Sequence, residues 1–399
     1  MNKLNLSALI CTLAGAALAD GLPDLTVPDG VGVNIHFTSG HEQDLAMIQT
    51  AGFKWVRQDF FWTKTERQSG VYDWAEYDAF TDSLEKHGLN AYYILDYSNP
   101  LYEKTVVSTN PVTGQLENRS VASPQQPASV QAFAQWAGAA AEHYRGRKVI
   151  WEIWNEPNIS FWKPTPDASQ YATLALATAK AMRAADPHVC IVAPTTSEFP
   201  WKFLETVFQS GLLEYLDAVS VHPYRGKPPE TAARDYERLR ELINRYAPAG
   251  RKIPIISGEW GYPTTTKGIS LDTQAAYIVR QQLSNLSSGI PVSIWYDWKN
   301  DGNDPNNSEH NFGMVDANLK PKPAYLAVQT MTRELSGFRI AGRQFAGDTN
   351  DFILTFTNSA GVTKYASWTS GKTHEVILNP ELKLELNQFP LYRLAPKAN

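Results

Sequence analysis

The sequence predicts an α/β fold, a (β/α)8 TIM barrel followed by a small all-β domain. Eight short apolar segments alternate with longer helical patterns from about residue 31 to residue 335, which is typical of parallel strands with helices between them. After residue 335 the pattern changes to short strands separated by Gly, Asn and Pro. Eight strand–helix units in about 300 residues fit such a barrel. A doubly wound open sheet is the alternative, but no Gly-x-Gly-x-x-Gly follows the first strand, which disfavours a nucleotide-binding version.

The predicted barrel strands are near-continuous apolar runs, as expected for strands buried on both faces. They are Val31–Phe37, Trp55–Phe60, Asn90–Tyr97, Val149–Trp154, Cys190–Thr195, Ala218–His222, Ile253–Glu259 and Pro291–Trp298. The segments between them carry helical patterns. These are Glu42–Ala51, Trp74–His87, Pro127–Tyr144, Asp167–Ala185, Pro229–Tyr246 and Asp272–Ser287, with a last helix at Ala324–Leu335. Two long polar loops are expected, at residues 98–127 after strand three and 299–312 after strand eight.

The C-terminal region predicts a small β-domain over residues 336–399, after a barrel over residues 20–335. Its expected strands are Phe338–Arg343, Phe352–Thr357, Lys364–Trp368, Glu375–Ile377, Lys383–Leu386 and Leu391–Leu394.

Residues 1–19 are typical of a signal peptide. Lys3 precedes an apolar run from Leu4 to Leu18, and Ala17-Leu18-Ala19 has the small-x-small form of a cleavage site. We therefore expect a secreted protein, extracellular or periplasmic, with no membrane association after cleavage; a retained anchor is the alternative. The mature chain would keep one cysteine, Cys190, and hence no internal disulfide.

The composition indicates which classes of binding partner fit the chain. A formal net charge of −5 argues against nucleic acid and anionic membrane surfaces. The 12 Trp and 18 Tyr residues are compatible with stacking on sugar rings, although core packing accounts for aromatic residues equally well. No cofactor is expected, and the sequence does not indicate an oligomeric state.

Polar and aromatic residues stand where the predicted strands end, and in a barrel these ends converge on one mouth. They are Arg57 on strand two, Asn155 and Glu156 after strand four, His222 and Tyr224 at strand six, Glu259 at strand seven, and Trp295 and Trp298 at strand eight. The loop after strand eight adds three carboxylates that could suggest calcium, Asp301, Asp304 and Glu309. Their spacing does not match an EF-hand, so we expect no metal.

Two facing carboxylates are what glycosidic bond cleavage needs, one protonated and one ionised. Glu259 is expected beside Arg57 and Tyr224, whose positive charge and hydroxyl favour an ionised nucleophile. Glu156 follows Trp154 and Asn155, an apolar and anionic setting that favours the protonated acid. Asn155 is a candidate for binding the sugar 2-hydroxyl.

Structural explanations remain open for several of these residues. Arg57 could belong to a rim salt bridge, and His222 could be a satisfied core histidine. Trp295 and Trp298 could be packing residues rather than substrate contacts. A Ser–His hydrolase site is disfavoured, because the chain has no Gly-x-Ser-x-Gly elbow around Ser257.

With these residues in place, the chain resembles clan A glycoside hydrolases near families 5 and 39, cellulase-like and xylosidase-like. The marks are Asn155-Glu156-Pro157 after strand four and Glu259 at strand seven. The following Asn158 and Phe161-Trp162 lean toward family 39, and His222-x-Tyr224 leans toward family 5. One departure is that family 5 members often carry His at the end of strand three, where this chain has Asp96-Tyr97.

The resemblance implies a retaining mechanism with Glu156 as acid/base and Glu259 as nucleophile. It implies that Arg57 and Tyr224 hold the nucleophile and that Asn155 holds the 2-hydroxyl. We therefore expect a hydrolase that cleaves β-linked bonds of a poly- or oligosaccharide by double displacement. A transglycosylase with the same site, or a non-catalytic carbohydrate-binding barrel, are the alternatives. The sequence does not name the sugar, the linkage or exo against endo action.

Overall fold

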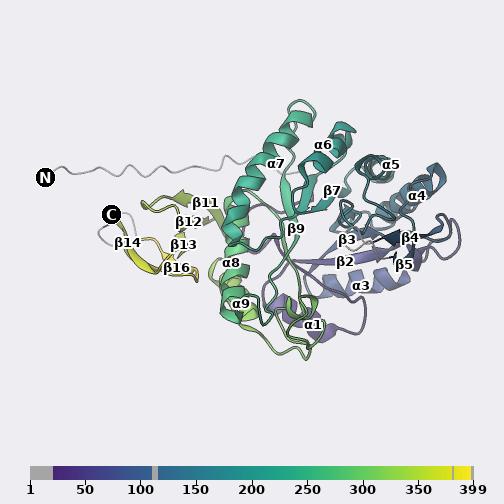
Figure 1. Cartoon of the computed structure of the whole chain (residues 1–399). Coiled ribbons are helices and arrows are strands. Elements are labelled where there is room, and N and C mark those ends of the chain that lie inside the picture. The colour runs from purple at the N-terminus through teal and green to yellow at the C-terminus, as the bar shows by residue number, and fades with distance from the viewer. Residues whose placement is uncertain (1–20, 110–115, 380–381, 397–399) are drawn as a thin grey trace.

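The computed structural model describes residues 21–109, 116–379 and 382–396. It places a closed barrel in the middle of the molecule and an antiparallel β-domain beside it (Figure 1). The predicted signal peptide, residues 1–19, lies outside the described residues. Within the described part of the chain, no helix is both long and apolar enough to cross a membrane.

Eight parallel strands form the barrel, which confirms the predicted fold. In the closed order they are β1 (Val31–Asn34), β10 (Ser293–Trp295), β9 (Ile255–Trp260), β8 (Ala218–His222), β7 (Cys190–Ser197), β6 (Val149–Ile153), β3 (Asn90–Asp96) and β2 (Trp55–Phe61). The register pairs Val33 with Trp295 on one side of β1 and with Val56 on the other, which closes the barrel. All strand ends that carry the predicted site therefore lie at one mouth.

Helices follow the strands around the outside. They are α1 (Glu42–Thr50), α2 (Trp62–Thr65), α3 (Ala75–Lys86), α4 (Pro127–His143), α5 (Ala168–Ala185), α6 (Trp201–Gln209), α7 (Ala233–Tyr246), α8 (Leu271–Ser287) and α9 (Pro323–Glu334), with 3-10 turns η1 (Leu212–Glu214), η2 (Pro229–Ala232) and η3 (Glu309–Asn311). The sequence did not predict α2 or α6. Helix α2 is a single turn of four residues, and α6 is rich in aromatic and β-branched residues that also favour strands.

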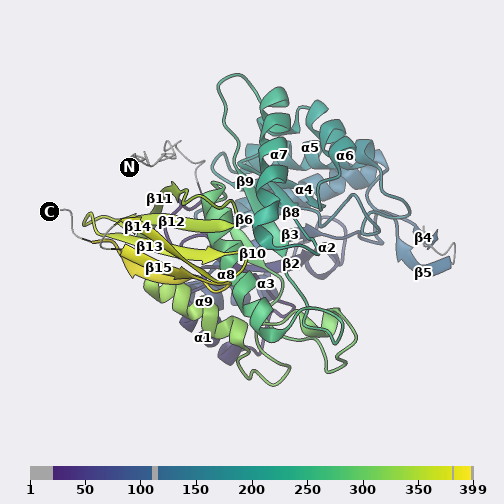
Figure 2. The ribbon, with the colours of Figure 1, turned by 60° about the vertical axis from the view of Figure 1, so that its left-hand side comes forward.

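The long loop after the third barrel strand contains a hairpin, β4 (Thr105–Thr109) paired with β5 (Leu116–Val121). Both views place this hairpin at the side of the molecule opposite the β-domain (Figures 1 and 2). The sequence analysis predicted only a polar loop here.

The C-terminal domain consists of β11 (Phe338–Gln344), β12 (Asp351–Asn358), β13 (Thr363–Thr369) and β16 (Leu391–Leu394) in one sheet, with β14 (His374–Asn379) and β15 (Leu382–Leu386) paired separately. The six strands match those that the sequence predicted. Figure 2 shows the sheet beside α8 and α9. Its inner residues, Phe338, Leu354, Phe356 and Trp368 among them, belong to the same hydrophobic cluster as the layer between the barrel and its helices.

The inside of the barrel has two chemical layers. Apolar side chains such as Trp55, Ile150, Val192 and Ile294 form a separate inner cluster. Nearer the carboxyl ends of the strands the buried side chains become polar and charged, and they include Arg57, Glu152, His222 and Glu259. Because buried charge is stable only when it is paired, these side chains must form hydrogen bonds and ion pairs with one another.

Candidate active site

Glu156 stands in a sharp turn that begins where β6 ends. Trp154 and Glu156 both have positive φ, 68° and 44°, an uncommon conformation for non-glycine residues. The Glu156 backbone N–H donates to the carbonyl of Thr195 at 3.1 Å, which ties the turn to β7. Burial raises the pKa of the Glu156 carboxyl to about 7, although Arg57 and Ser197 oppose this. The positive φ angles of Trp154 and Glu156 indicate backbone strain, which is characteristic of functional sites.

Glu259 lies in β9, and its carboxylate accepts hydrogen bonds from two side chains. Arg57 Nη1 donates to Oε2 at 2.5 Å, and the Tyr224 hydroxyl donates to Oε1 at 2.7 Å. These are the two neighbours that the sequence predicted for it. Both contacts stabilise the ionised carboxylate, as a nucleophile requires.

Arg57 is the centre of the polar layer and is only 1% exposed. Its guanidinium donates to Glu152 at 2.7 and 3.2 Å, to Asn34 at 2.9 Å and to Asn155 at 2.8 Å, in addition to Glu259. A rim salt bridge, the structural alternative for Arg57, is therefore excluded by its burial. Glu152 and Glu259 both pair with the single guanidinium charge, and the contact with Arg57 fixes the Glu259 side chain.

The sequence analysis missed Glu152 and Asn34. Glu152 is 0% exposed and lies in the middle of β6, so a search limited to strand ends passed over it. A charged residue inside an otherwise apolar strand was the available indication. Its spacing of two from Ile150, which lies in the inner cluster, places its side chain inside the barrel.

His222 connects the two candidate catalytic carboxylates. Its Nδ1 is hydrogen-bonded to Glu156 Oε1 at 2.8 Å and lies 3.9 Å from Glu259 Oε1, while its Nε2 is 3.5 Å from Arg57 Nη2. Burial, assisted by Arg57, lowers the pKa of His222 to about 4. A neutral imidazole therefore holds Glu156 in place.

The two carboxylates lie close together. One oxygen of Glu156, one oxygen of Glu259 and a ring nitrogen of His222 are all within 4.8 Å of one another. Asn155 completes this group: its Oδ1 accepts from Arg57, and its Nδ2 donates to the Tyr97 hydroxyl at 3.1 Å. Six predicted site residues thus form one connected network.

The other two predicted residues, Trp295 and Trp298, lie elsewhere. Both are buried in the core between the barrel and its helices, and Trp298 Nε1 donates to Asp44 of α1 at 2.9 Å. From the same segment, Tyr296 reaches the mouth, where its hydroxyl donates to Glu309 at 3.3 Å. Substrate binding by the two tryptophans stays a prediction.

Two stacked aromatic residues, Phe161 and Tyr97, lie beside the Glu156 turn. Phe161 is 40% exposed and stacks on Tyr97, with 5.7 Å between ring centroids and 5° between planes. Because Tyr97 also contacts Asn155, this exposed aromatic face begins directly beside the network. Aromatic faces of this kind stack on the apolar faces of sugar rings.

Two groups of side chains have the spacing for a metal ion among the described residues. One is the Glu156, His222 and Glu259 group already described, and the other is His36, Asp297 and Asp301. In the first group Arg57 and Tyr224 already occupy both Glu259 oxygens. Two carboxylates and an imidazole in this arrangement are suited to acid–base chemistry.

Comparison with known proteins points to families 5 and 39 of the glycoside hydrolases. The family model described as cellulase (glycosyl hydrolase family 5) matches residues 29–302. A β-xylosidase of Geobacillus stearothermophilus is 33% identical over 95 residues, which cover 23% of this chain and only 18% of that relative.

Solved structures share the fold over most of the chain. A family 39 glycoside hydrolase from the gut symbiont Bacteroides cellulosilyticus WH2 superposes with a TM-score of 0.76 at 22% identity, covering 96% of this chain and 82% of that one. A family 39 β-xylosidase from Caulobacter crescentus gives 0.64 at 20% identity, covering 92% and 82%. The resemblance to clan A near families 5 and 39 is thereby confirmed, and the family model, which spans more than half of the sequence, shows that this chain belongs to the cellulase family, glycosyl hydrolase family 5.

Proposed function

We propose that this chain is a secreted retaining glycosidase that hydrolyses β-linked bonds of a poly- or oligosaccharide by double displacement. The observation that carries the proposal is that one carboxylate oxygen of Glu156 and one of Glu259 lie within 4.8 Å of each other. Retaining enzymes place the two carboxyl groups ~5–5.5 Å apart, whereas inverting enzymes need ~6.5–9.5 Å to admit a water molecule. The short separation supports direct attack by one carboxylate.

The surroundings of the two groups support their roles. Glu156, with a pKa raised to about 7 by burial, would protonate the leaving oxygen and then, as a base, activate the water that resolves the intermediate. Glu259, held by Arg57 and Tyr224, would attack the anomeric carbon. Asn155 would hold the 2-hydroxyl of the sugar, a contact that strengthens in the transition state.

Replacement of either carboxylate tests the proposal. We expect Glu156→Gln to lower kcat/KM by about 10²- to 10⁴-fold on natural substrates, which need a proton donor. The loss should be much smaller on an aryl glycoside whose leaving group needs no proton. Glu259→Gln should abolish turnover on both. The exposed Glu198, at the same end of the barrel, provides a matched control, since Glu198→Gln should retain activity.

Azide rescue separates the two roles. With an activated aryl glycoside, azide should restore turnover of Glu259→Ala and yield a glycosyl azide of inverted configuration. In Glu156→Ala it should yield one of retained configuration, because azide then attacks the glycosyl-enzyme. Near wild-type activity of Glu156→Gln on natural substrates, or of Glu259→Gln on any substrate, would refute the assignment.

Two alternatives give different products. A transglycosylase would release little reducing sugar and would lengthen oligosaccharides. A non-catalytic barrel would bind sugars without releasing any product. The presence of both carboxylates at the short separation favours catalysis over binding alone.

The sugar on which the chain acts is to be identified with a panel of substrates. The names of similar proteins, cellulase and β-xylosidase, suggest aryl β-glucosides, aryl β-xylosides and β-glucans as the first members of a substrate panel.

The proposal of secretion rests on residues 1–19 alone. Expression in a secreting host should yield a mature chain that begins near residue 20; an intact N-terminus in the membrane fraction would instead indicate a retained anchor.

A further inference from the structure

Glu152 is a buried carboxylate that the proposed reaction does not use. It lies within β6 and is 0% exposed, so neither solvent nor substrate touches it. Its two oxygens accept from Nε and Nη2 of Arg57 at 3.2 and 2.7 Å, a bidentate contact. Burial of a second carboxylate on the guanidinium that holds Glu259 costs free energy, which calls for a reason beyond the holding of the nucleophile.

Arg57 interacts more strongly with Glu152 than with Glu259. Burial by itself would lower the pKa of Arg57, but the pKa is raised well above its usual value, by Glu152 first and by Glu259 second. Glu259 accepts one hydrogen bond from the guanidinium, whereas Glu152 accepts two. The charge of Arg57 is therefore balanced chiefly by Glu152.

Among the described residues, the ion pairs of Arg57 are those with Glu152 and Glu259. Asp96 is a further buried carboxyl near Arg57. Burial in the first place, and Asp59 in the second, raise the pKa of Asp96 well above its usual value, although Arg57 opposes this. Asp96 therefore favours the neutral acid and supplies no counter-charge.

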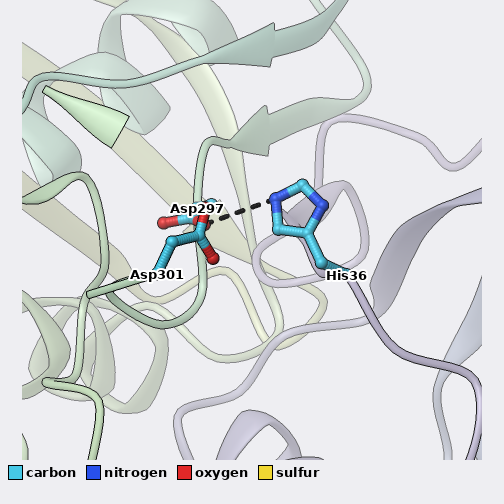
Figure 3. Close-up of side chains that lie close together, drawn as sticks. All are labelled: His36, Asp297 and Asp301. Atoms are coloured by element: carbon cyan, nitrogen blue, oxygen red, sulfur yellow. Dashed lines mark ion pairs between the residues drawn. The ribbon is translucent and has the colours of Figure 1, made fainter. Parts of the chain in front are cut away.

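Asp297, another buried carboxyl at the mouth, has a counter-charge of its own. Its Oδ2 lies 3.5 Å from His36 Nε2, and Figure 3 shows the imidazole facing it, with Asp301 beside the pair. Although burial opposes it, the contact with Asp297 raises the pKa of His36 to about 9, so the imidazole is charged at neutral pH. Asp297 is thus balanced by His36 and leaves Arg57 to Glu152 and Glu259.

The proposed reaction removes one of these two counter-charges. In the first step Glu259 forms a bond to the anomeric carbon, the bond to the leaving oxygen breaks, and the proton of Glu156 passes to that oxygen. Glu259 becomes an uncharged ester and Glu156 becomes an anion. Because Arg57 makes its ion pairs with Glu152 and Glu259, the guanidinium then keeps Glu152 alone as a direct partner.

We propose that Glu152 is a positioning residue that keeps Arg57 paired and in place while Glu259 is esterified, and that it thereby stabilises the glycosyl-enzyme. This inference rests on the proposed glycosidase function and adds a residue to its site. A buried guanidinium without an anion is strongly destabilised. Without Glu152 the covalent intermediate therefore becomes unfavourable relative to the free enzyme, whose Arg57 still has Glu259.

A covalent trap separates the two steps of the reaction. The probe is the 2,4-dinitrophenyl 2-deoxy-2-fluoro form of the β-glycoside that the wild type hydrolyses best. The fluorine opposes positive charge at the anomeric carbon and slows both steps, while the good leaving group lets the intermediate accumulate. Release of dinitrophenolate gives the rate of formation, the mass of the intact protein follows breakdown, and peptide mapping checks that the label is on Glu259.

Asp217 provides a matched control for the loss of a buried carboxylate. It is 8% exposed and accepts from Arg183 Nη2 at 2.7 Å. It directly precedes β8 (Ala218–His222), so it lies at the amino end of the barrel, opposite the candidate site. Asp217→Asn should lower thermal stability but leave formation and breakdown of the intermediate at the wild-type rates.

We expect Glu152→Gln to form the intermediate about 10²- to 10³-fold more slowly than the wild type, because the buried guanidinium loses its anion. Breakdown should be at least as fast as in the wild type, since the return of charge to Glu259 pairs Arg57 again. Glu152→Asp keeps the charge and should recover most of the loss. Circular dichroism and thermal unfolding check that each variant is folded.

A second background shows whether Glu152 acts through Arg57. In Arg57→Gln no guanidinium needs an anion, so adding Glu152→Gln should not slow formation of the intermediate further. This double variant leaves no buried cation unpaired, and it decides the question if Glu152→Gln alone does not fold. A further loss in the double variant would contradict the inference.

Three other outcomes would overturn the inference. One is near wild-type formation of the intermediate by Glu152→Gln. Another is an equal slowing of formation and breakdown, which indicates general damage to the site. The third is an equal loss in Glu152→Asp and Glu152→Gln, since the charge would then be irrelevant. Failure of the wild type to form any intermediate on Glu259 would refute the proposed function instead, so the two failures are distinguishable.

Discussion

At the scale of single residues, Glu156 sets the expected pH dependence. Its carboxyl must be protonated to act as the acid, and burial raises its pKa to about 7. The protonated fraction falls as pH rises through that value, so we expect kcat/KM to decline above about pH 7. Because kcat/KM reports the free enzyme, the profile should be measured with a substrate whose leaving group needs protonation.

Ser197 offers a control for the cause of this decline. A hydrogen bond from Ser197 favours the ionised Glu156 and lowers the pKa of its carboxyl. Ser197→Ala should therefore move the alkaline limb toward higher pH, and Glu156→Gln should remove the limb. A limb that stays at the same pH in both variants would show that another group controls it.

Individual site residues could be predicted where their position in the chain was enough to place them at the barrel mouth. Glu156 and Glu259 were found because parallel strands bring their carboxyl ends to one mouth. Glu152 and Asn34 were not, since their importance depends on which neighbour each side chain meets across the barrel. The sequence left open whether Trp298 packs in the core or contacts substrate, because a position at a strand end does not give the depth of the side chain.

At the scale of elements, the barrel strands were predictable because each is a run of apolar residues with no competing helical period. The helix α6 was missed although it is as long as the predicted α1, because its aromatic and β-branched residues are equally typical of a strand. The β4–β5 hairpin was missed for another reason. Its β-branched run at Thr105–Val107 was read as part of a polar loop, and its pairing with Ser120 and Val121 is not local.

Strand β9 imposes a constraint beside Glu259 that a substitution can test. A Cβ at Gly258 would lie 2.3 Å from Ser220 Oγ and 3.3 Å from His222 Nε2. We expect Gly258→Ala to lower the free energy of unfolding by about 1–3 kcal/mol through overpacking. It should also reduce activity, since the displaced backbone carries Glu259. Urea denaturation and kcat/KM check the two effects.

The same substitution at Gly226 is the matched control. Gly226 lies in the loop after β8, and a Cβ there would meet no atom within 4 Å. Gly226→Ala should therefore leave both stability and activity close to wild type. Equal effects at the two positions would show that loss of glycine flexibility, rather than crowding, is responsible.

At the scale of the whole molecule, the β-domain and the barrel are joined by a buried charge. Glu230, in the loop that follows Tyr224, accepts from Arg280 of α8 at 2.5 and 2.9 Å and from Trp368 Nε1 of the β-domain at 2.6 Å. Trp368 in turn stacks on Phe352, with 5.0 Å between ring centroids. The sequence predicted the two parts separately but could not predict this junction, because its partners are up to 138 residues apart.

A shared core and the hydrogen bond from Trp368 to Glu230 should make the two parts unfold together. We expect a single transition in urea when tryptophan fluorescence and far-ultraviolet circular dichroism are compared. Trp368→Phe should lower the free energy of unfolding by about 1.5–3 kcal/mol, because a buried carboxylate loses a donor. Ile377→Val, at a β-domain side chain that is 68% exposed, should change it by less than about 0.5 kcal/mol. If the two probes gave separate transitions, or if Trp368→Phe were as stable as the control, Glu230 would not couple the β-domain to the loop that carries Tyr224.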